Sequence, residues 1–275
     1  MKPLNIPVKV VGQEEDGLEY FSMPKGMDVY AAPHLPEPEE MVDLAEAKAV
    51  LAEMRAALAS CGQLKTIGLG YLPAADRALL GQVLGEGEVS IRIDADFPVK
   101  IQESILTGVW QIRGFDQAGT MILDEIEVGA FPERVISSAL ESATGIDFPE
   151  SLPKGGMNAL PVLAELRSKA ESYRAGDAAH VVNLTLLPMT PADMGCIEAA
   201  LGIGAVTILS RGYGNCRISS TQLANVWWVQ YYNSQDVMIL NTLEVVDLPD
   251  VVRAASQDIE DSCERLEEIL QWVGA

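Results

Sequence analysis

The sequence predicts an α+β protein built from two copies of one α-β-α-β-hairpin-α unit, related by a pseudo-twofold axis. With an offset of 117, residues 84–135 align with residues 201–252 without a gap, and sixteen of the 52 pairs are identical. The identical pairs include Trp110 with Trp227, and both copies show the same succession of helical and strand patterns. This period is longer than that of solenoid repeats, so a tandem duplication of a larger unit is expected.

The first two elements of each copy are a helix and a short strand. Residues 41–60 and 159–174 carry apolar residues at spacings of three and four, which is typical of an amphipathic helix. The apolar runs at 66–70 and 181–187 are short and favour strands. Each copy is therefore expected to begin with a helix that leads into a strand.

A second helix is expected next in each copy. A Pro/Asp segment opens it, at Pro73–Leu84 and at Pro191–Leu201, and a glycine follows its last residue. Glycine is common at this place because it adopts the left-handed backbone conformation that terminates a helix. Gly85 and Gly202 are therefore predicted to end these helices.

Strands, a hairpin and a last helix complete each copy. Asp116–Gly119 and Asn233–Asp236 carry turn-forming residues between apolar runs, which predicts two β-hairpins. Pro132 and Pro249 then indicate where the last helix begins, because the fixed φ of proline suits the first helical turn. The strands are expected near 88–93, 108–114 and 120–128, and near 205–210, 226–232 and 237–246.

The chain is expected to divide into three segments. Residues 1–40 lie outside the repeat, and their end (AAPHLPEPEE) is rich in Pro and Glu, which is typical of an extended, solvated linker. Residues 41–150 form the first repeat unit, and residues 151–275 form the second. We expect the two units to pack against each other.

The composition limits the classes of partner. The chain has 275 residues, of which 48% are apolar, so it can build a substantial core. Forty acidic residues against nineteen basic ones give a net charge of −21. Phosphate backbones and anionic membrane surfaces would repel such a chain. Nucleic-acid binding is therefore not expected, and a basic peptide or a protein surface is the more suitable partner.

Several features predict a cytoplasmic protein. The N-terminal region lacks the apolar stretch of a signal peptide, and no run of about 18 apolar residues would insert into a membrane. Cys61, Cys196, Cys216 and Cys263 are scattered without a CxxC pair, which suits reduced thiols. Only two histidines are present, so a His-rich metal site is excluded, and no cofactor is predicted.

Positions that differ between the copies are candidates for a function that one copy performs alone. The largest contrast lies at 210–236, where arginine, aromatic and cysteine side chains replace those of 93–119. Gly212 and Gly214 flank Tyr213, and their backbone freedom would place its ring on a loop surface. Trp, Tyr and Arg are enriched in interface hot spots. The predicted partner-binding residues are Arg211, Tyr213, Asn215, Cys216, Arg217, Trp228, Gln230 and Tyr231.

Alternate residues of a strand face opposite sides of a sheet. Trp227 and Tyr231 are therefore expected on one face of the second hairpin, and Trp228 and Gln230 on the other. Two interpretations remain open: both aromatic rows are buried under layers of the fold, or one of them forms a recognition surface. Burial is favoured for Trp227, because Trp110 occupies its place in the first copy.

The segment ILSRGYGNCRISST, followed by NVWWVQYYNSQDVMILNTLEVVDLP, resembles the C-terminal conserved region of the HupH/HyaF family of hydrogenase expression proteins. The resemblance is dense over about 200–250 and extends more weakly along the rest of the chain. It implies an accessory role in maturing the iron–sulfur small subunit of uptake NiFe-hydrogenases, as a dedicated chaperone that acts before export with the large subunit. The resemblance supplies no catalytic residues.

Cys216 is the residue to weigh as a reactive thiol. Arg211 and Arg217 would lower the pKa of its thiol, but no acyl-transfer signature surrounds it, and its counterpart in the first copy is Val99. A single thiol also lacks the partners of an iron–sulfur site, which usually takes four thiolates. A structural cysteine is favoured, and thiol-dependent redox or iron–sulfur handling is the alternative.

Together these observations predict a chaperone that binds the hydrogenase small-subunit precursor in the cytoplasm. No catalytic motif is found, so no enzymatic activity is predicted. Twin-arginine export peptides are basic, and a chain with a charge of −21 would attract one and raise the rate of association. Other hydrogenase accessory proteins are further expected partners.

Overall fold

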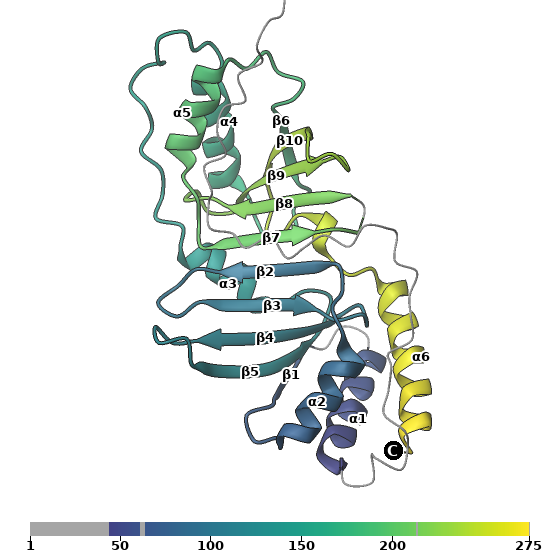
Figure 1. Cartoon of the computed structure of the whole chain (residues 1–275). Helices are drawn as coiled ribbons and strands as arrows, with labels where there is room; N and C mark the ends of the chain where they lie inside the picture. Colours follow the sequence, from purple (N-terminus) through teal and green to yellow (C-terminus); the bar gives the residue numbers. More distant parts are fainter. Residues whose placement is uncertain (1–43, 61–63, 213, 275) are drawn as a thin grey trace, which may run out of the picture. The chain divides into compact units, whose positions relative to one another are not determined.

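The computed structural model describes residues 44–60, 64–212 and 214–274 (Figure 1). The expected N-terminal segment 1–40 lies outside these residues. Within them, helices alternate with antiparallel strands, which agrees with the predicted α+β class. The described helices and strands therefore form a mixed architecture built on one sheet.

All the described strands join one antiparallel sheet, in the order β1-β5-β4-β3-β2-β7-β8-β9-β10-β6. The order is symmetric about its centre: each strand of the first half has a counterpart at the same distance from the opposite edge, β1 with β6, β2 with β7, and so on to β5 with β10. The first half consists of β1 (Lys65–Gly68), β2 (Val89–Ile93), β3 (Val99–Glu103), β4 (Val109–Phe115) and β5 (Met121–Val128). The second half consists of β6 (His180–Asn183), β7 (Val206–Ser210), β8 (Asn215–Ser220), β9 (Val226–Tyr232) and β10 (Met238–Val245).

The two halves join through the β2–β7 pair at the centre of the sheet. In this pair Ile91 lies directly opposite Ile208, and the offset of 117 aligns these two residues in the sequence. Val89 and Ile93 pair with Ser210 and Val206 on either side. The hydrogen bonds of this antiparallel pair join one half of the sheet to the other.

The predicted helices and hairpins are present, with small shifts at their ends. Gly85 and Gly202 follow the last residues of α2 and α5 with φ of 52° and 58°, as expected for glycines that end helices. The turns at Asp116–Gly119 and Asn233–Asp236 close the β4–β5 and β9–β10 hairpins. The helices are α1 (Ala45–Ala59), α2 (Ala74–Leu84), α3 (Glu133–Glu141), α4 (Ala159–Ser172), α5 (Pro191–Leu201), the short 3-10 helix η2 (Asp250–Val252) and α6 (Ser256–Val273).

Two expectations about local structure are wrong. The expected strands omit β3 and β8, although Val99–Glu103 and Asn215–Ser220 each pair with a strand on both sides. The last helix does not begin at Pro249. A single 3-10 turn follows that proline, Arg253 returns to an extended conformation, and α6 begins only at Ser256.

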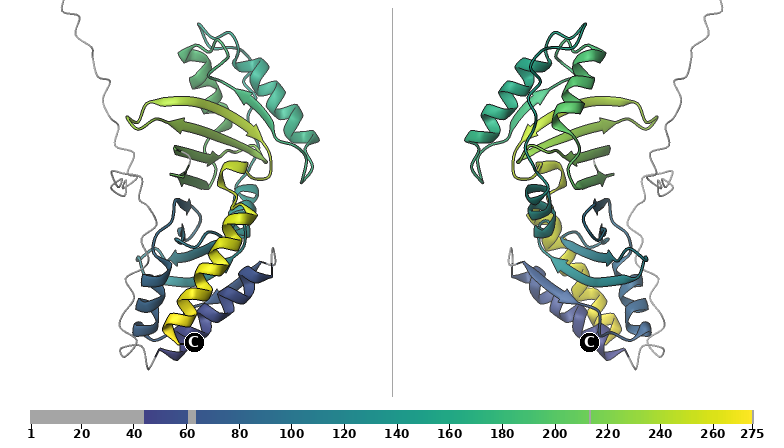
Figure 2. Two further views of the ribbon diagram at one scale, coloured as in Figure 1. Left: turned by 90° about the vertical axis from the view of Figure 1, so that its right-hand side faces the viewer. Right: turned by 90° about the vertical axis from the view of Figure 1, so that its left-hand side faces the viewer.

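The sheet buries apolar side chains on both faces. On one face α3 and the η2 turn cover a core that contains Trp110, Ile208 and Trp227. On the other face, α1, α2 and α6 pack near β1 and β5, and α4 and α5 pack near β6 and β10. Figure 2 shows α6 running alongside α1, so the C-terminal helix of the second half lies against the first half.

Candidate functional site

One face of the central strands is left uncovered by the described helices (Figure 1). We use the name open face for the side chains of β2, β3, β4, β7, β8 and β9 that point away from α3. They lie between the helices at the two ends of the sheet. The open face includes Arg92, Lys100, Arg113, Arg217, Trp228 and Gln230.

Three cations lie in direct register on the first half of the open face. Arg92 of β2 lies opposite Lys100 of β3, and Lys100 lies opposite Arg113 of β4. Residues directly opposite on antiparallel strands have Cβ atoms about 4.5–5.5 Å apart. The side chains of Arg92 and Arg113 are 46% and 52% exposed. We name these three residues the cationic row.

Carboxylates accompany the two ends of the cationic row. Arg92 Nε donates to Asp94 Oδ1 at 2.7 Å, and Arg113 Nε lies 3.9 Å from Asp124 Oδ1. Asp124 is shared, because Arg77 also lies 3.4 Å from its other oxygen. Lys100, in the middle, has no ion pair with any described residue, and its Nζ lies 5.9 Å from the centroid of the Phe115 ring. Within the described part of the chain, no carboxylate forms an ion pair with the middle of the row.

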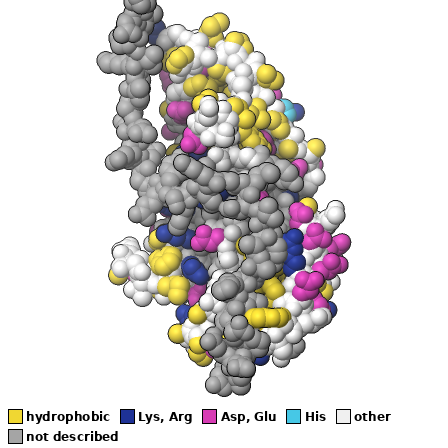
Figure 3. Space-filling view, turned by 45° about the vertical axis from the view of Figure 1, so that its right-hand side comes forward, with side chains coloured by type: hydrophobic (Ala, Val, Ile, Leu, Met, Phe, Trp, Pro, Cys, Tyr) yellow, Lys and Arg dark blue, Asp and Glu magenta, His cyan; other side chains and the backbone are white. Residues whose placement is uncertain are grey.

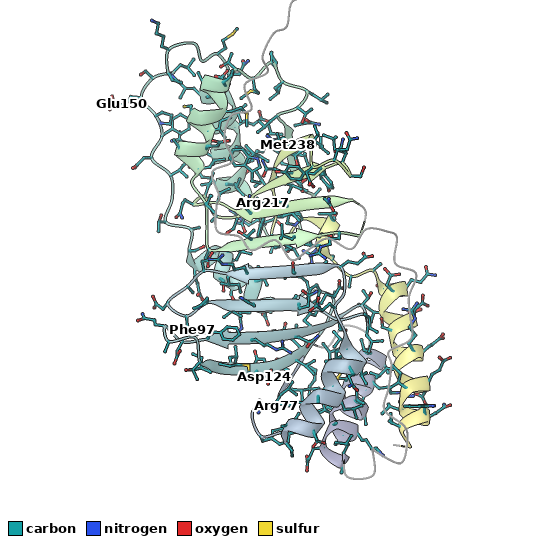
Figure 4. All side chains as sticks on the ribbon, in the orientation of Figure 1. Arg77, Phe97, Asp124, Glu150, Arg217 and Met238 are labelled. Atoms are coloured by element: carbon teal, nitrogen blue, oxygen red, sulfur yellow. The ribbon has the colours of Figure 1, made fainter. Side chains whose placement is uncertain are left out.

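Arg217 is the counterpart of Lys100 in the second half of the open face (Figure 4). It lies on β8 between Leu209 of β7 and Gln230 of β9. Its guanidinium makes no ion pair with a described residue, and its Nε is buried without a hydrogen-bond partner. A buried donor that has lost its hydrogen bond to water and gained no partner costs free energy. A hydrogen bond to an acceptor atom of a ligand would recover this cost.

The neighbours of Arg217 are neutral and amide-rich. Trp228 is half-buried, packs against the core under α4 and α5, and donates its Nε1 hydrogen to Asn241 Oδ1. Gln230 Nε2 contacts Met238 Sδ at 3.7 Å, and Tyr232 donates its hydroxyl to Gln230 Oε1 at 3.4 Å. The second half of the open face therefore offers one cation among hydrogen-bonding amides.

Cys216 and Tyr231 lie on the opposite face, in the core under α3. They are directly opposite in the β8–β9 register, and Cys216 is only 3% exposed. Burial raises the pKa of the Cys216 thiol to about 12, although the hydrogen bond with Tyr231 opposes this rise. Burial also raises the pKa of Tyr231 to about 12. At neutral pH the Cys216 thiol is protonated and therefore a weak nucleophile.

The eight predicted partner-binding residues thus fall on two sides of the sheet. Asn215, Arg217, Trp228 and Gln230 belong to the open face, as strand alternation predicted for Trp228 and Gln230. Arg211 follows β7, half-buried, and its backbone nitrogen donates to Glu88 O at 3.1 Å. Tyr213 lies outside the described residues. Cys216 is not on an exposed loop as its neighbourhood suggested, because it occupies an inward-facing position of β8.

The cationic row was not among the predicted sites, because no strand was expected at Val99–Glu103 and the face on which Lys100 lies was therefore not predicted. A signal was available: in Val99–Glu103 (VKIQE) apolar and polar residues alternate, which is the period of a half-buried strand. Arg92 and Arg113 lie on strands that were expected, but only the β3 register brings them together.

Charge is distributed unevenly over the surface (Figure 3). Acidic side chains gather along one flank, where the exposed carboxylates of α6 include Asp258, Glu260, Asp261, Glu264 and Glu268. The lysine and arginine side chains of the cationic row belong to the open face instead. The net charge of −21 therefore does not describe the local charge of every surface.

The described residues contain no cluster of three His, Cys, Asp or Glu side chains arranged to hold a metal ion. No described helix combines the length and apolar character needed to cross a membrane. A shallow cavity of about 490 Å³ lies between α5 and the loop that precedes α4, and Pro149, Leu152, Gly195 and Cys196 line it. The described residues that were predicted to bind a partner are not among those that line it.

The chain belongs to the family of HupH hydrogenase expression proteins. The family's region described as "HupH hydrogenase expression protein, C-terminal conserved region" matches residues 44–147 and 156–273. These two ranges correspond to the two halves of the sheet with their helices. The resemblance noted for 200–250 therefore extends over nearly all of the described chain.

Relatives of similar length carry names of the same kind. The chain is 46% identical, over 100% of both chains, to the hydrogenase expression/formation protein HoxQ of Cupriavidus necator. It is 44% identical to the hydrogenase expression/formation protein HupH of Rhodobacter capsulatus, over 95% of this chain and 93% of the relative. The structure of the hydrogenase expression protein HupH from Thiobacillus denitrificans matches with a TM-score of 0.38 and 27% identity, over 43% of this chain and 97% of that one.

Proposed function

We propose that this protein is an accessory chaperone in hydrogenase maturation, which binds the iron–sulfur small-subunit precursor in the cytoplasm before assembly and export. The observation that carries the proposal is its likeness, over the whole chain, to a hydrogenase expression/formation protein. The geometry adds a surface suited to binding a macromolecule. The open face presents cations, amides and a half-buried tryptophan on a rigid sheet.

The contact surface that we propose for the precursor is the second half of the open face. Arg217 has a buried Nε without a partner, and Gln230 and Asn215 lie beside it on the same side of the sheet. Arginine and tryptophan contribute strongly when they are desolvated at the centre of an interface. Trp228 would act mainly by holding the local surface in place, since Asn241 and the α4–α5 core already fix its ring.

We also propose that the two halves arose as a tandem duplication and then diverged. The two equivalent tryptophans make similar contacts: Trp110 Nε1 donates to Gly129 O, and Trp227 Nε1 donates to Asp247 O, one residue beyond the position equivalent to Gly129. The strand order is the same from both edges. Divergence is concentrated on the open face, where Lys100 and Arg113 of the first half become Arg217 and Gln230 of the second.

A role for the twin-arginine signal peptide of the precursor rests on charge. A basic peptide would find its complement on the acidic flank of α6 and not on the cationic row. Binding that stays unchanged when the signal peptide is deleted, and that is insensitive to salt, would remove this part of the proposal without affecting the rest.

The test is affinity capture from cells that produce hydrogenase. The tagged chain should co-purify the small-subunit precursor, and Arg217→Gln should recover clearly less of it. Arg167→Gln is the matched control, because Arg167 is an exposed arginine of α4, away from the open face. Capture without any small-subunit precursor, or equal capture by both variants and the wild-type chain, would contradict the proposed contact.

The alternative of thiol-dependent redox or iron–sulfur handling at Cys216 gains no support from this geometry. The thiol is buried, its pKa is raised to about 12, and its side chain forms a hydrogen bond with Tyr231. Maturation should therefore survive Cys216→Ser, whereas a thiol reaction would be abolished by it.

A further inference from the structure

The cationic row is an arrangement that the fold itself does not need. Like charges directly opposite on neighbouring strands destabilise a sheet, and here Lys100 has an arginine opposite it on both sides. Neighbouring strands lie about 4.8 Å apart, so the row spans roughly 10 Å from Arg92 to Arg113. Three cations within that span repel one another unless anions stand beside them.

Among the described residues, carboxylates compensate the row at its two ends. Asp94 pairs with Arg92, and Asp124 divides its two oxygens between Arg113 and Arg77. Lys100 keeps no ion pair with a described residue, and Arg217, in the other half of the same face, has none either. The face therefore holds unpaired cations in a chain that has twice as many acids as bases.

The chemistry of the ligand follows from this local charge and from the charge of the whole chain. A long polyanion such as nucleic acid would meet the field of the remaining surface, which carries a net charge of −21. A short anionic segment meets only the charges within about one Debye length, roughly 10 Å at 0.1 M salt. An extended peptide advances about 3.3 Å per residue, so a few residues with two carboxylates would span the row.

We propose that the cationic row binds an extended acidic segment of a protein partner, and that Arg217, two strands away from Arg92 on the same face, contributes to the same surface. Carboxylates of the segment would pair with Lys100 and with the guanidinium groups of Arg92 and Arg113. The proposal deepens the proposed function, on which it rests for the identity of the partner, by naming the chemistry of the segment that is bound.

The first experiment measures binding of a fluorescein-labelled peptide of alternating Glu and Gly residues by fluorescence anisotropy. The full chain should bind it at low salt, more weakly as salt rises, and should not bind the same peptide with Gln in place of Glu. Lys100→Gln should weaken binding at least about fivefold, which corresponds to about 1 kcal/mol. Lys169→Gln, the same charge change at an exposed position of α4, should leave binding within about twofold.

The stability of the Lys100→Gln variant distinguishes a binding role of Lys100 from a structural one, because loss of a structural lysine would lower stability. Because Lys100→Gln removes repulsion within the row, its thermal unfolding midpoint should equal or exceed that of the wild-type chain. Weaker peptide binding together with undiminished stability supports the proposal. Absence of peptide binding, equal binding by the Lys100 and Lys169 variants, or equally tight binding of a single-stranded oligothymidylate would overturn it.

Capture of the small-subunit precursor separates this inference from the proposed function. If the precursor is captured but the acidic peptide does not bind, the inference fails and the proposed function stands. If the peptide binds through the row but no precursor is captured, the inference stands and the identity of the partner is wrong.

Discussion

The Oδ1 atom of Asp193 accepts a hydrogen bond from the backbone nitrogen of Ala159 at 3.0 Å, across 34 residues of sequence. The same carboxylate accepts further hydrogen bonds from the backbone of Met157 and Asn158, and from the amide and hydroxyl of Thr190. One buried side chain on α5 therefore fixes the beginning of α4. Asp76, the equivalent residue of α2, makes one such bond to Ala47 at the start of α1.

We expect Asp193→Asn to lower the thermal unfolding midpoint more than Asp76→Asn. An asparagine in place of the carboxylate keeps only one acceptor atom and turns the other into a donor that faces donors. Five hydrogen bonds reach the two oxygens of Asp193, so the variant loses the acceptor of at least two of them. The variant at Asp76 can keep its single bond to Ala47 on the remaining oxygen. Equal losses in the two variants, measured by circular dichroism at neutral pH, would contradict this ranking.

The Asp193 contribution should also depend on pH. Burial acts to raise the pKa of this carboxyl, but the hydrogen bonds from Thr190, Met157 and Asn158 hold it well below its ordinary value of 3.8. A group with a depressed pKa in the folded state stabilises the protein above its unfolded pKa and loses that contribution as pH falls. The difference in midpoint between the wild-type chain and Asp193→Asn should therefore shrink below pH 3.8. A difference that is constant with pH would contradict the assignment.

Glu103 should show the opposite dependence. Burial, reinforced by the nearby charge of Glu88, raises the pKa of Glu103 from 4.5 to about 7. Below pH 4.5 both states are protonated, and between pH 4.5 and 7 the folded state binds more protons, so stability falls as pH rises. Glu103→Gln should be more stable than the wild-type chain above pH 7, by about 3 kcal/mol at most, and the gain should vanish near pH 4. Denaturant unfolding across this range measures the difference.

Cys216 should resist alkylation in the folded chain. Its thiol is buried and its pKa is raised to about 12, so very little thiolate forms at pH 8. Cys196 and Cys263 are more exposed and provide internal controls. Mass spectrometry after brief iodoacetamide treatment should find both controls modified well before Cys216, and all three modified together after unfolding. Early modification of Cys216 would show that β8 opens readily.

Local sequence patterns predicted most of the helices and both hairpins, because these elements depend on short-range periodicity and turn chemistry. Gly85 and Gly202 mark helix ends in the sequence and take positive φ angles in the structure. Strands β3 and β8 were missed because each is short and alternates polar with apolar residues after a glycine- or proline-containing stretch. The polar members, Lys100 and Arg217 among them, suggested loops.

The candidate site depended on information that no local pattern carries. The register of β2 against β3 and of β3 against β4 decides that Arg92, Lys100 and Arg113 are neighbours. Register is fixed by the whole sheet, since a shift of one residue would turn Ile101 outward and Lys100 into the core. Alternation alone was sufficient for β9, where it correctly placed Trp227 and Trp228 on opposite faces.

The C-terminal helix should stabilise the first half of the protein, although it follows the second half in sequence. Leu266 of α6 is fully buried in the cluster that includes Val50 and Leu51 of α1. Glu267 of α6 forms an ion pair with Arg55 of α1. Leu266→Ala should cost about 3 kcal/mol through lost burial and a residual cavity. Hydrogen exchange should show α1 losing protection before α4 and α5 do.

Leu163→Ala is the matched control for this last prediction, because Leu163 is an equally buried leucine in the core of α4 and α5. It should cost a similar free energy, but its early loss of protection should lie in α4 and α5. The two ends of the sheet are joined through β2 and β7, and α6 contacts α1. If protection is lost first in α1 for Leu266→Ala and first in α4 and α5 for Leu163→Ala, each end of the sheet has its own core. If both variants instead loosened α1 and α4 equally, α6 would not be a specific support of the first half.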